Sequence, residues 1–311
     1  MILVSAFSFN LVNLSSNEVW SGNAITVADN GTIGGPARAL FIDRNDTIFI
    51  GAYQKSQILI WSKDSVTPTY IINATLSEYS PIFVTDAADI YFENGNKRGQ
   101  VVKLSLTLNQ TITVAQFEHH CYGLFITDDN AVYCSQYSTH KVVRFSLNIT
   151  HENETIVAGT GDSGNAMSQL NGPWGIDVDQ NFSLFVADYW NNRIQLFKSG
   201  QLNGTIVAGQ GVPQGLKLNR PTDVTFDANN NMYIADAHNG RVIRVSGSQW
   251  SCVAACDGKR DDEPNQFQLR DAYIIRFDSH ENIYVGDEHN NRIQKFRLRT
   301  NPGGMYSIKN K

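Results

Sequence analysis

One pattern of apolar and polar residues recurs along the chain about every 50 residues and restricts the possible folds more than any other feature. Its clearest copy is NGPWGIDVDQNFSLFVADYWNNRIQLF at residues 171–197, and the pattern returns at 219–245 and 270–296. An aspartate closes the second apolar segment of each copy, at positions 48 and 51 residues apart: Asp188, Asp236 and Asp287. A period of this length is typical of repeat architectures.

Three weaker copies precede these. They are AVYCSQYSTHKVVRF around Gln136, TIFIGAYQKSQILIW around Ala52, and DIYFENGNKRGQVVKL at residues 89–104, which has a longer loop. Val, Ile, Phe and Tyr alternate with polar residues, and no segment keeps a helical period, so every element is predicted to be a strand. The clearest copy divides into strands A to D: GIDVD, SLFVAD, RIQLF and GTIVAG. Four strands per unit and six units predict an all-β, six-bladed β-propeller with antiparallel strands.

The two ends of the chain predict how the ring closes. The last copy ends at RIQKFRL without a fourth strand, while AITVADNG at residues 24–31 matches the fourth strand ETIVAGTG at 154–161. We expect residues 24–31 to pair with the last blade, since closure removes exposed strand edges. The domains are then a leader segment or signal remnant at 1–23, one propeller at 24–300, and a C-terminal tail at 301–311.

The units PWGIDVDQ…LFVADYWNNRIQLF and VTFDANNNMYIADAHNGRVIRV resemble the NHL repeat family of six-bladed propellers. The resemblance is strong in the last three copies, moderate near Gln136 and weak in the first two. It implies two known activities. The peptidyl-hydroxyglycine amidating lyase holds zinc through histidines at the starts of inner strands, and the propellers of tripartite-motif proteins bind RNA through a basic face.

Neither activity fits this chain. The positions that correspond to the lyase histidines contain none: Arg38, Ser80, Tyr122, Trp174, Thr222 and Tyr273. The net charge is −5, the pI is about 5.8 and no basic cluster is present, so no nucleic-acid partner is expected. We expect no enzyme activity and no cofactor. A metal-dependent enzyme, amidating-lyase-like or a calcium enzyme of the lactonase kind, stays the alternative, although no blade breaks the repeat with a carboxylate cluster at the channel mouth.

Asn-x-Ser/Thr sites and cysteines indicate an extracellular protein. Nine such sites occur, against roughly four expected by chance: Asn13, Asn30, Asn45, Asn73, Asn109, Asn148, Asn153, Asn181 and Asn203. The four cysteines are an even number, which also fits a secreted protein. No apolar run approaches twenty residues, so we expect no insertion into a membrane.

The cysteines are expected to form two disulfides. Cys121 begins a strand A and Cys134 lies near the end of the next strand, so antiparallel pairing brings them close. Cys252 and Cys256 flank a strand D in WSCVAACDG. They would lie roughly 13 Å apart in a straight strand, so this bridge requires a bend.

The loops after strand B carry further polar residues. Asp188, Asn191 and Arg193 recur at equivalent positions in the last three copies. We interpret them as a structural loop motif, because Asp and Asn stabilise turns and a single metal site would not recur in every blade. His238 and His289 occupy the loop position of Trp190. A zinc pair is conceivable, but zinc sites usually need three or four ligands, so surface histidines are the preferred interpretation.

The repeat also predicts which face binds a partner. The D–A and B–C loops share one end of the propeller, here called the upper face, and the A–B and C–D loops share the lower face. Six glycosylation sites map to the lower face, whereas Asn30 and Asn73 map near the ends of D strands. Aromatic and polar residues gather on the upper face: Arg38, Tyr122, Trp174, Tyr189, Trp190, Thr222, His238, Tyr273 and His289. We expect a monomeric, non-enzymatic scaffold that binds a protein or small ligand there.

Overall fold

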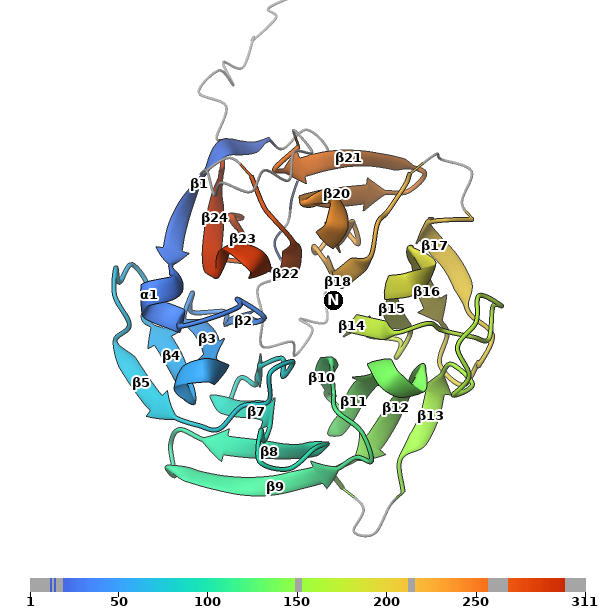
Figure 1. The fold of residues 1–311 in the computed structure, drawn as a ribbon, viewed down its shortest axis with the longest axis horizontal. Helices are drawn as coiled ribbons and strands as arrows, with labels where there is room; N and C mark the ends of the chain where they lie inside the picture. The colour runs from blue at the N-terminus through green and yellow to red at the C-terminus, as the bar shows by residue number, and fades with distance from the viewer. Residues whose placement is uncertain are drawn as a thin grey trace, which may run out of the picture.

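The computed structural model describes residues 12, 14, 19–148, 153–211, 216–256 and 268–299. These residues form six four-stranded antiparallel sheets arranged as blades around a central channel (Figure 1). The predicted six-bladed β-propeller is therefore confirmed, and the looser second copy is a complete blade.

Each blade is a meander whose first strand lies innermost. Blades 1 to 3 contain β2 (Ala39–Ile42), β3 (Ile48–Ala52), β4 (Gln57–Trp61) and β5 (Tyr70–Asn73); β6 (Phe83–Val84), β7 (Asp89–Glu93), β8 (Gln100–Ser105) and β9 (Gln110–Gln116); and β10 (Gly123–Thr127), β11 (Ala131–Gln136), β12 (Lys141–Ser146) and β13 (Thr155–Ala158). Blades 4 to 6 contain β14 (Pro173–Val178), β15 (Leu184–Asp188), β16 (Arg193–Phe197) and β17 (Thr205–Gly209); β18 (Pro221–Phe226), β19 (Met232–Asp236), β20 (Arg241–Ser246) and β21 (Gln249–Ala254); and β22 (Ala272–Phe277), β23 (Ile283–Asp287), β24 (Arg292–Leu298) and β1 (Trp20–Ala28).

The N-terminal strand closes the ring as predicted, but it begins earlier than expected. Ala24 of β1 lies opposite Phe296 of β24, and Trp20 lies opposite Leu298. The strand ends at Ala28, because the chain then turns into the short helix α1 (Asn30–Ile33), which is capped by the Asp29 side chain. The outermost strand of the last blade is thus residues 20–28 rather than 24–31.

Aromatic side chains join neighbouring blades near the channel. Phe41, Phe83 and Phe125 come from the inner strands of blades 1, 2 and 3, and consecutive ring centroids lie 5.3 and 5.2 Å apart. Phe185 and Phe226 form a similar contact between blades 4 and 5. Such pairs contribute about 0.5–1.5 kcal/mol each beyond the burial of their area. The blades are therefore held in fixed positions, which fixes the loops on both faces.

The recurrent aspartates tie two loops of the upper face together. Asp188 accepts hydrogen bonds from the backbone N–H of Asn171, the amide of Asn191 and the guanidinium of Arg193, at 2.7–2.8 Å. Asp236 and Asp287 make the same three bonds in their blades. The N–H groups come from the preceding D–A loop, so each aspartate joins two loops and does not only stabilise its own turn. The carboxylates are fully buried, and burial raises the pKa of Asp188 and Asp236.

The B–C loops themselves are short helical turns. Five of them contain a single 3₁₀ turn: Tyr53–Lys55, Tyr137–Thr139, Tyr189–Asn191, Ala237–Asn239 and Glu288–Asn290. Each turn ends at a residue in the left-handed conformation, which Asn, Gly and His adopt at low cost in four of the blades. The turn therefore presents its first two side chains on the upper face at the same position in every such blade.

Both disulfides are present. Cys121 and Cys134 are bonded within blade 3 with their Cα atoms 5.1 Å apart. Cys252 and Cys256 are bonded with their Cα atoms 5.6 Å apart, because β21 ends at Ala254 and Ala255 takes a φ of +54°. This turn supplies the bend that the second bridge requires.

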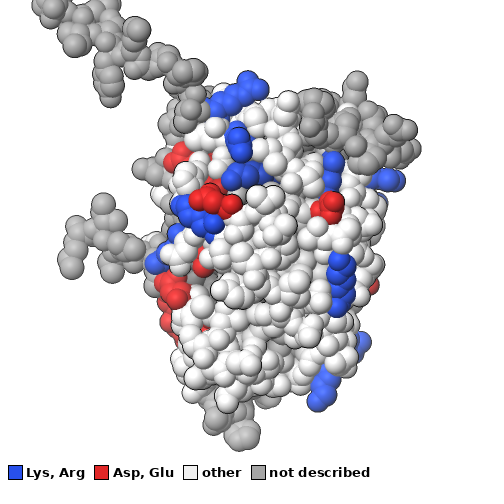
Figure 2. Space-filling view, turned by 90° about the vertical axis from the view of Figure 1, so that its left-hand side faces the viewer, with Lys and Arg blue, Asp and Glu red and all other residues white. Residues whose placement is uncertain are grey.

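Charged residues of both signs are interspersed on the side of the propeller that shows β1, α1 and β5, and a broad area between them carries no charge (Figure 2). Within the described ranges, no helix has the length and apolar character needed to cross a membrane.

Candidate functional site

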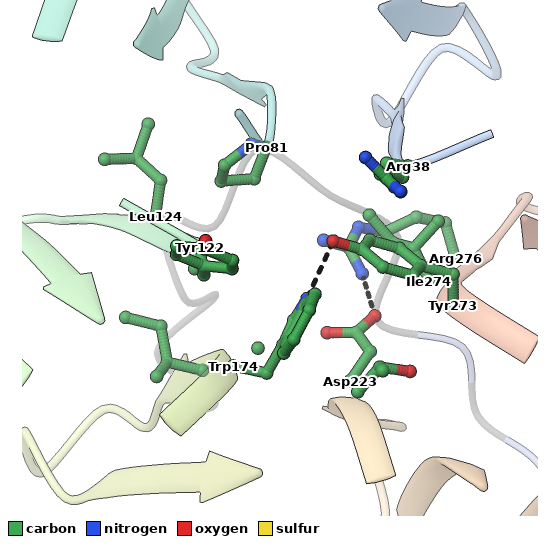
Figure 3. A pocket seen from close by; sticks show the side chains of 13 residues that line it. Arg38, Pro81, Tyr122, Leu124, Trp174, Asp223, Tyr273, Ile274 and Arg276 are labelled. Atoms are coloured by element: carbon green, nitrogen blue, oxygen red, sulfur yellow. Dashed lines mark hydrogen bonds and ion pairs between the residues drawn. The ribbon is translucent and has the colours of Figure 1, made fainter. Parts of the chain in front are cut away.

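The starts of the inner strands converge on the upper mouth of the channel. One cavity there is lined by five of the predicted residues, each from a different blade (Figure 3): Arg38, Tyr122, Trp174, Thr222 and Tyr273. Its free volume is only about 20 Å³, room for about one water molecule. The mouth of the channel is therefore filled by side chains.

Trp174 is the main part of this plug. Its Nε1–H donates a 2.7 Å hydrogen bond to the hydroxyl of Tyr273, two blades away (Figure 3). Its ring centroid lies 4.8 Å from that of Tyr189 and 4.9 Å from that of Tyr122, and its backbone carbonyl accepts from the hydroxyl of Ser135. The repeat does not require tryptophan at this position, but in the folded ring Trp174 is half-buried and packed on several sides.

A stack of tyrosines continues from the plug toward blade 2. Tyr79, Tyr122 and Tyr137 lie face to face, with centroid distances of 4.5 and 5.0 Å. The repeat pattern does not indicate Tyr79. The inner-strand position of blade 2 was predicted to be Ser80, whose side chain is buried and accepts the backbone N–H of Glu93. Tyr79, one residue earlier, takes the place at the mouth.

Arg38 is held by charges on two sides. Its guanidinium donates to Glu78 and to Glu288 at 2.7 Å each, and its carbon lies 4.8 Å from the ring centroid of Tyr79. Glu288 begins the B–C loop of blade 6, so the two ion pairs connect blades 1, 2 and 6. Arg38 is therefore already paired with two carboxylates of the protein itself.

The outer part of the cluster is more accessible. Trp190 is 42% exposed, and its Nε1–H donates to the hydroxyl of Tyr137 at 2.6 Å. The guanidinium carbon of Arg220 lies 4.3 Å from the Trp190 ring centroid and 5.8 Å from that of Tyr189. His238 is half-buried, and its Nε2 lies 3.4 Å from the Tyr189 hydroxyl and 3.3 Å from Nη1 of Arg220. Arg220 is a second residue of the cluster that the repeat pattern does not indicate.

Two of the predicted binding residues lie beneath the surface. Tyr273 is 4% exposed and Thr222 is 3% exposed. The Thr222 hydroxyl donates to the backbone carbonyl of Ala272 at 2.9 Å, which joins blade 5 to blade 6. Burial raises the pKa of Tyr273 well above its usual value, so it stays a neutral hydroxyl. These two residues form the floor of the site rather than its contact surface.

The two loop histidines have different surroundings. His289 is exposed and lies 2.5 Å from the carboxylate of Asp271, and with Glu288 these residues place one ligand atom each within 4.8 Å of one another. Two carboxylates and a histidine are a possible donor set for a metal ion. However, Glu288 also pairs with Arg38, whose positive charge opposes a cation at this point. His238 is not part of this group.

A group of buried charges lies below the plug. Asp223 accepts a 2.9 Å hydrogen bond from the guanidinium of Arg276 (Figure 3) and another of the same length from the backbone N–H of Ile275. Burial raises the pKa of Asp177 to about 8, and the charge of Asp223 adds to this rise while Arg276 opposes it. Neither aspartate stands out in the sequence, because both fit the strand alternation of their blades.

A larger cavity lies away from the upper face. Its free volume is about 260 Å³, and it lies between blades 3 and 4 near their A–B and C–D turns. Tyr133, Phe182 and Phe197 supply aromatic surface, and an ion pair of 2.7 Å joins Arg144 to Asp129 at its edge. This cavity is the main alternative to the upper face as the position of a binding site.

The Asn-x-Ser/Thr sites are distributed as the repeat predicts. Every such asparagine in the described ranges is exposed: Asn30, Asn45, Asn73, Asn109, Asn148, Asn153, Asn181 and Asn203. Six of them lie in A–B or C–D turns, on the lower face, while Asn30 and Asn73 follow or end the outer strands β1 and β5. Asn13 lies outside the described residues.

Comparison with known proteins agrees with this architecture. The NHL repeat family matches residues 170–197, which include the whole hairpin of β14 and β15 and the strand β16. The chain is thus a six-bladed β-propeller that carries an NHL repeat. No curated protein matches the sequence significantly.

Solved structures with the same fold have different descriptions. A structural genomics protein of unknown function from Bacteroides thetaiotaomicron superposes with a TM-score of 0.71 at 13% identity, covering 91% of this chain and 77% of that one. An auxiliary nutrient binding protein from the same species gives 0.66 at 15%, covering 94% and 76%. Virginiamycin B lyase from Staphylococcus aureus gives 0.57 at 12%, covering 89% and 98%. At these identities the likeness establishes the fold alone.

Proposed function

We propose that the protein is a non-enzymatic, extracellular binding propeller that recognises a protein or small ligand on its upper face. The observation that carries this proposal is the exposed indole of Trp190 at the rim of the aromatic cluster. Its ring is fixed by the hydrogen bond to Tyr137 and by Arg220, so it would lose little entropy on contact with a partner. Rigid aromatic side chains with surrounding polar groups are typical of binding hot spots.

Two features support binding over catalysis. The inner-strand positions that hold histidines in the amidating lyase contain none here. In addition, Trp174 and its neighbours leave room for about one water molecule at the channel mouth, so a substrate would have to displace the plug.

Other features support an extracellular location. One disulfide lies in blade 3 and the other lies at the end of strand β21 in blade 5. Disulfides persist in oxidising compartments and are rare in the cytosol. Eight exposed Asn-x-Ser/Thr sites are also available for glycans, most of them on the lower face. Glycans there would leave the upper face open to a partner.

The alternative is a metal-dependent propeller enzyme. It is favoured by the Asp271, Glu288 and His289 group beside Arg38 and by the buried pair of Asp177 and Asp223 in the channel. One neighbour of the same fold is described as a lyase. Inductively coupled plasma mass spectrometry of protein purified without chelators distinguishes the two: about one bound zinc or calcium per chain would favour the enzyme.

A binding screen with paired variants tests the proposal. Immobilised wild-type protein is screened against purified extracellular proteins and metabolites, and each hit is measured again with Trp190→Ala and Trp250→Ala. Trp250 is a matched control, because it is 39% exposed but lies on the outer strand β21. We expect Trp190→Ala to weaken binding by about 2 kcal/mol, a typical hot-spot loss, and Trp250→Ala to have no effect. Equal binding by both variants would contradict the proposal.

A further inference from the structure

Arg220 has a backbone conformation that is unfavourable for its residue type. Its φ is +53°, in the left-handed region, and the corresponding residue of blade 4 is Gly172 with a φ of +64°. Both precede a proline that begins the inner strand. Glycine adopts this conformation without cost, whereas a residue with a Cβ atom is strained there. Strain at a surface position is often retained because the side chain has a function.

The Arg220 side chain lies across the exposed part of the aromatic cluster. It covers Trp190 at 4.3 Å and reaches Nε2 of His238 with Nη1 at 3.3 Å. Because a guanidinium only donates, His238 accepts this bond through a neutral ring nitrogen. The Tyr189 hydroxyl lies beside the same nitrogen, at 3.4 Å. One cation, one imidazole and one hydroxyl thus meet at the edge of the tryptophan.

The contrast with Arg38 shows what is unusual about this cation. Both arginines lie over aromatic rings of the upper face, but Arg38 has two carboxylate partners at 2.7 Å. In the part of the chain that the structure describes, Arg220 pairs with no carboxylate. The five donors of a guanidinium form a planar fork that matches a carboxylate.

We propose that Arg220 is an anion-binding residue of the upper face and that it binds the carboxylate of a ligand whose flat body contacts Trp190. The proposal rests on the proposed binding function of this face and specifies the chemistry of its ligand. Arg220 supplies the charge and the paired donors, while the indole supplies apolar contact area. The strained backbone is the cost of placing a cation at this point.

Benzoate and benzamide, which have the same shape and differ in charge, are suitable probes. Binding is followed through the indole N–H resonance of Trp190, assigned with Trp190→Phe. We expect benzoate to shift this resonance saturably with a Kd in the millimolar range, as expected for a fragment of this size. Benzamide should bind about tenfold more weakly or not at all. Equal binding of the two probes, or no saturable shift with benzoate up to about 50 mM, would overturn the proposal.

Three variants test the role of Arg220 itself. Arg220→Gln and Arg220→Gly should each weaken benzoate binding about tenfold or more. Arg297→Gln makes the same charge change at an exposed residue of β24 and should not weaken it. Arg220→Gly should keep or raise Tm, since glycine relieves the strain. Unchanged benzoate binding in Arg220→Gly would refute the role of Arg220. If the Trp190-dependent partner binding then persists, the proposed function stands and only the anion specificity fails.

Discussion

The indole nitrogen of Trp174 in blade 4 donates a 2.7 Å hydrogen bond to the hydroxyl of Tyr273 in blade 6, and so links two blades that are not neighbours. Because Trp174 also packs against several tyrosines, its replacement leaves a cavity at the channel mouth. We expect Trp174→Ala to lower the free energy of unfolding by about 2–4 kcal/mol. Tyr273→Phe removes only the hydrogen bond and should cost about 1 kcal/mol.

Trp190 should behave differently in the same experiment. It is 42% exposed, so Trp190→Ala should cost less than about 1 kcal/mol. Urea unfolding followed by far-ultraviolet circular dichroism measures all three variants. Equal losses for Trp174→Ala and Trp190→Ala would show that the outer ring is also structural, and that the plug and the binding surface are not separate.

The buried aspartates predict how stability depends on pH. Because the pKa of Asp177 is raised from 3.8 to about 8, its effect on stability is most favourable below pH 3.8 and is lost as the pH rises toward 8. The limiting slope is about 1.4 kcal/mol per pH unit for one proton. Asp177→Asn fixes the neutral form, so its Tm advantage over the wild type should grow between pH 5 and pH 8.

The comparison with Asp177→Asn is needed because the pKa values of other carboxylates are shifted in the same direction. Burial also raises the pKa of Asp188, Asp223 and Asp236. The difference in Tm between variant and wild type isolates residue 177. A constant difference from pH 5 to pH 8 would show that Asp177 is ionised throughout.

The loop aspartates should be essential for stability. Asp188→Ala leaves Arg193 buried without its carboxylate and frees the N–H of Asn171. Breaking a buried ion pair from one side costs about 3–5 kcal/mol. We expect thermal denaturation of Asp188→Ala at a much lower temperature than the wild type. A loss below about 1 kcal/mol would mean that water replaces these bonds and that the motif is dispensable.

The two disulfides should differ in their contributions. The Cys121–Cys134 bridge closes 13 residues and the Cys252–Cys256 bridge closes 4. In the chain-entropy description, they stabilise by about 3 and about 2 kcal/mol. Double Cys→Ser variants measured by urea unfolding test this order. The reverse order would point to enthalpic differences at the two sites.

The blades could be predicted because their signals are local. Alternation of apolar residues and turn-forming Asn, Asp and Gly recur with every copy, so even the weak copy at residues 89–104 forms two strands of a blade. The closing strand could be predicted because its sequence matches the other fourth strands. Its start at Trp20 could not be predicted, since β1 begins before the matched segment.

The site was only partly predictable because it is made by contacts between blades. The sequence placed Tyr122, Trp174 and Tyr189 on one face. It did not indicate that Trp174 lies across the channel or that Tyr273 lies beneath it. Arg220 was missed because a positive φ is a property of the folded backbone, and Asp177 because burial in the channel follows from ring closure.

The binding role of the upper face is tested most directly by hydrogen–deuterium exchange on the wild-type protein, with and without a partner from the binding screen. We predict protection in the loops around Trp190, Arg220 and His238, with little change elsewhere. Protection confined to the A–B and C–D turns around Phe182 and Lys198, beside the larger cavity, would contradict this account and place the binding site on the lower face.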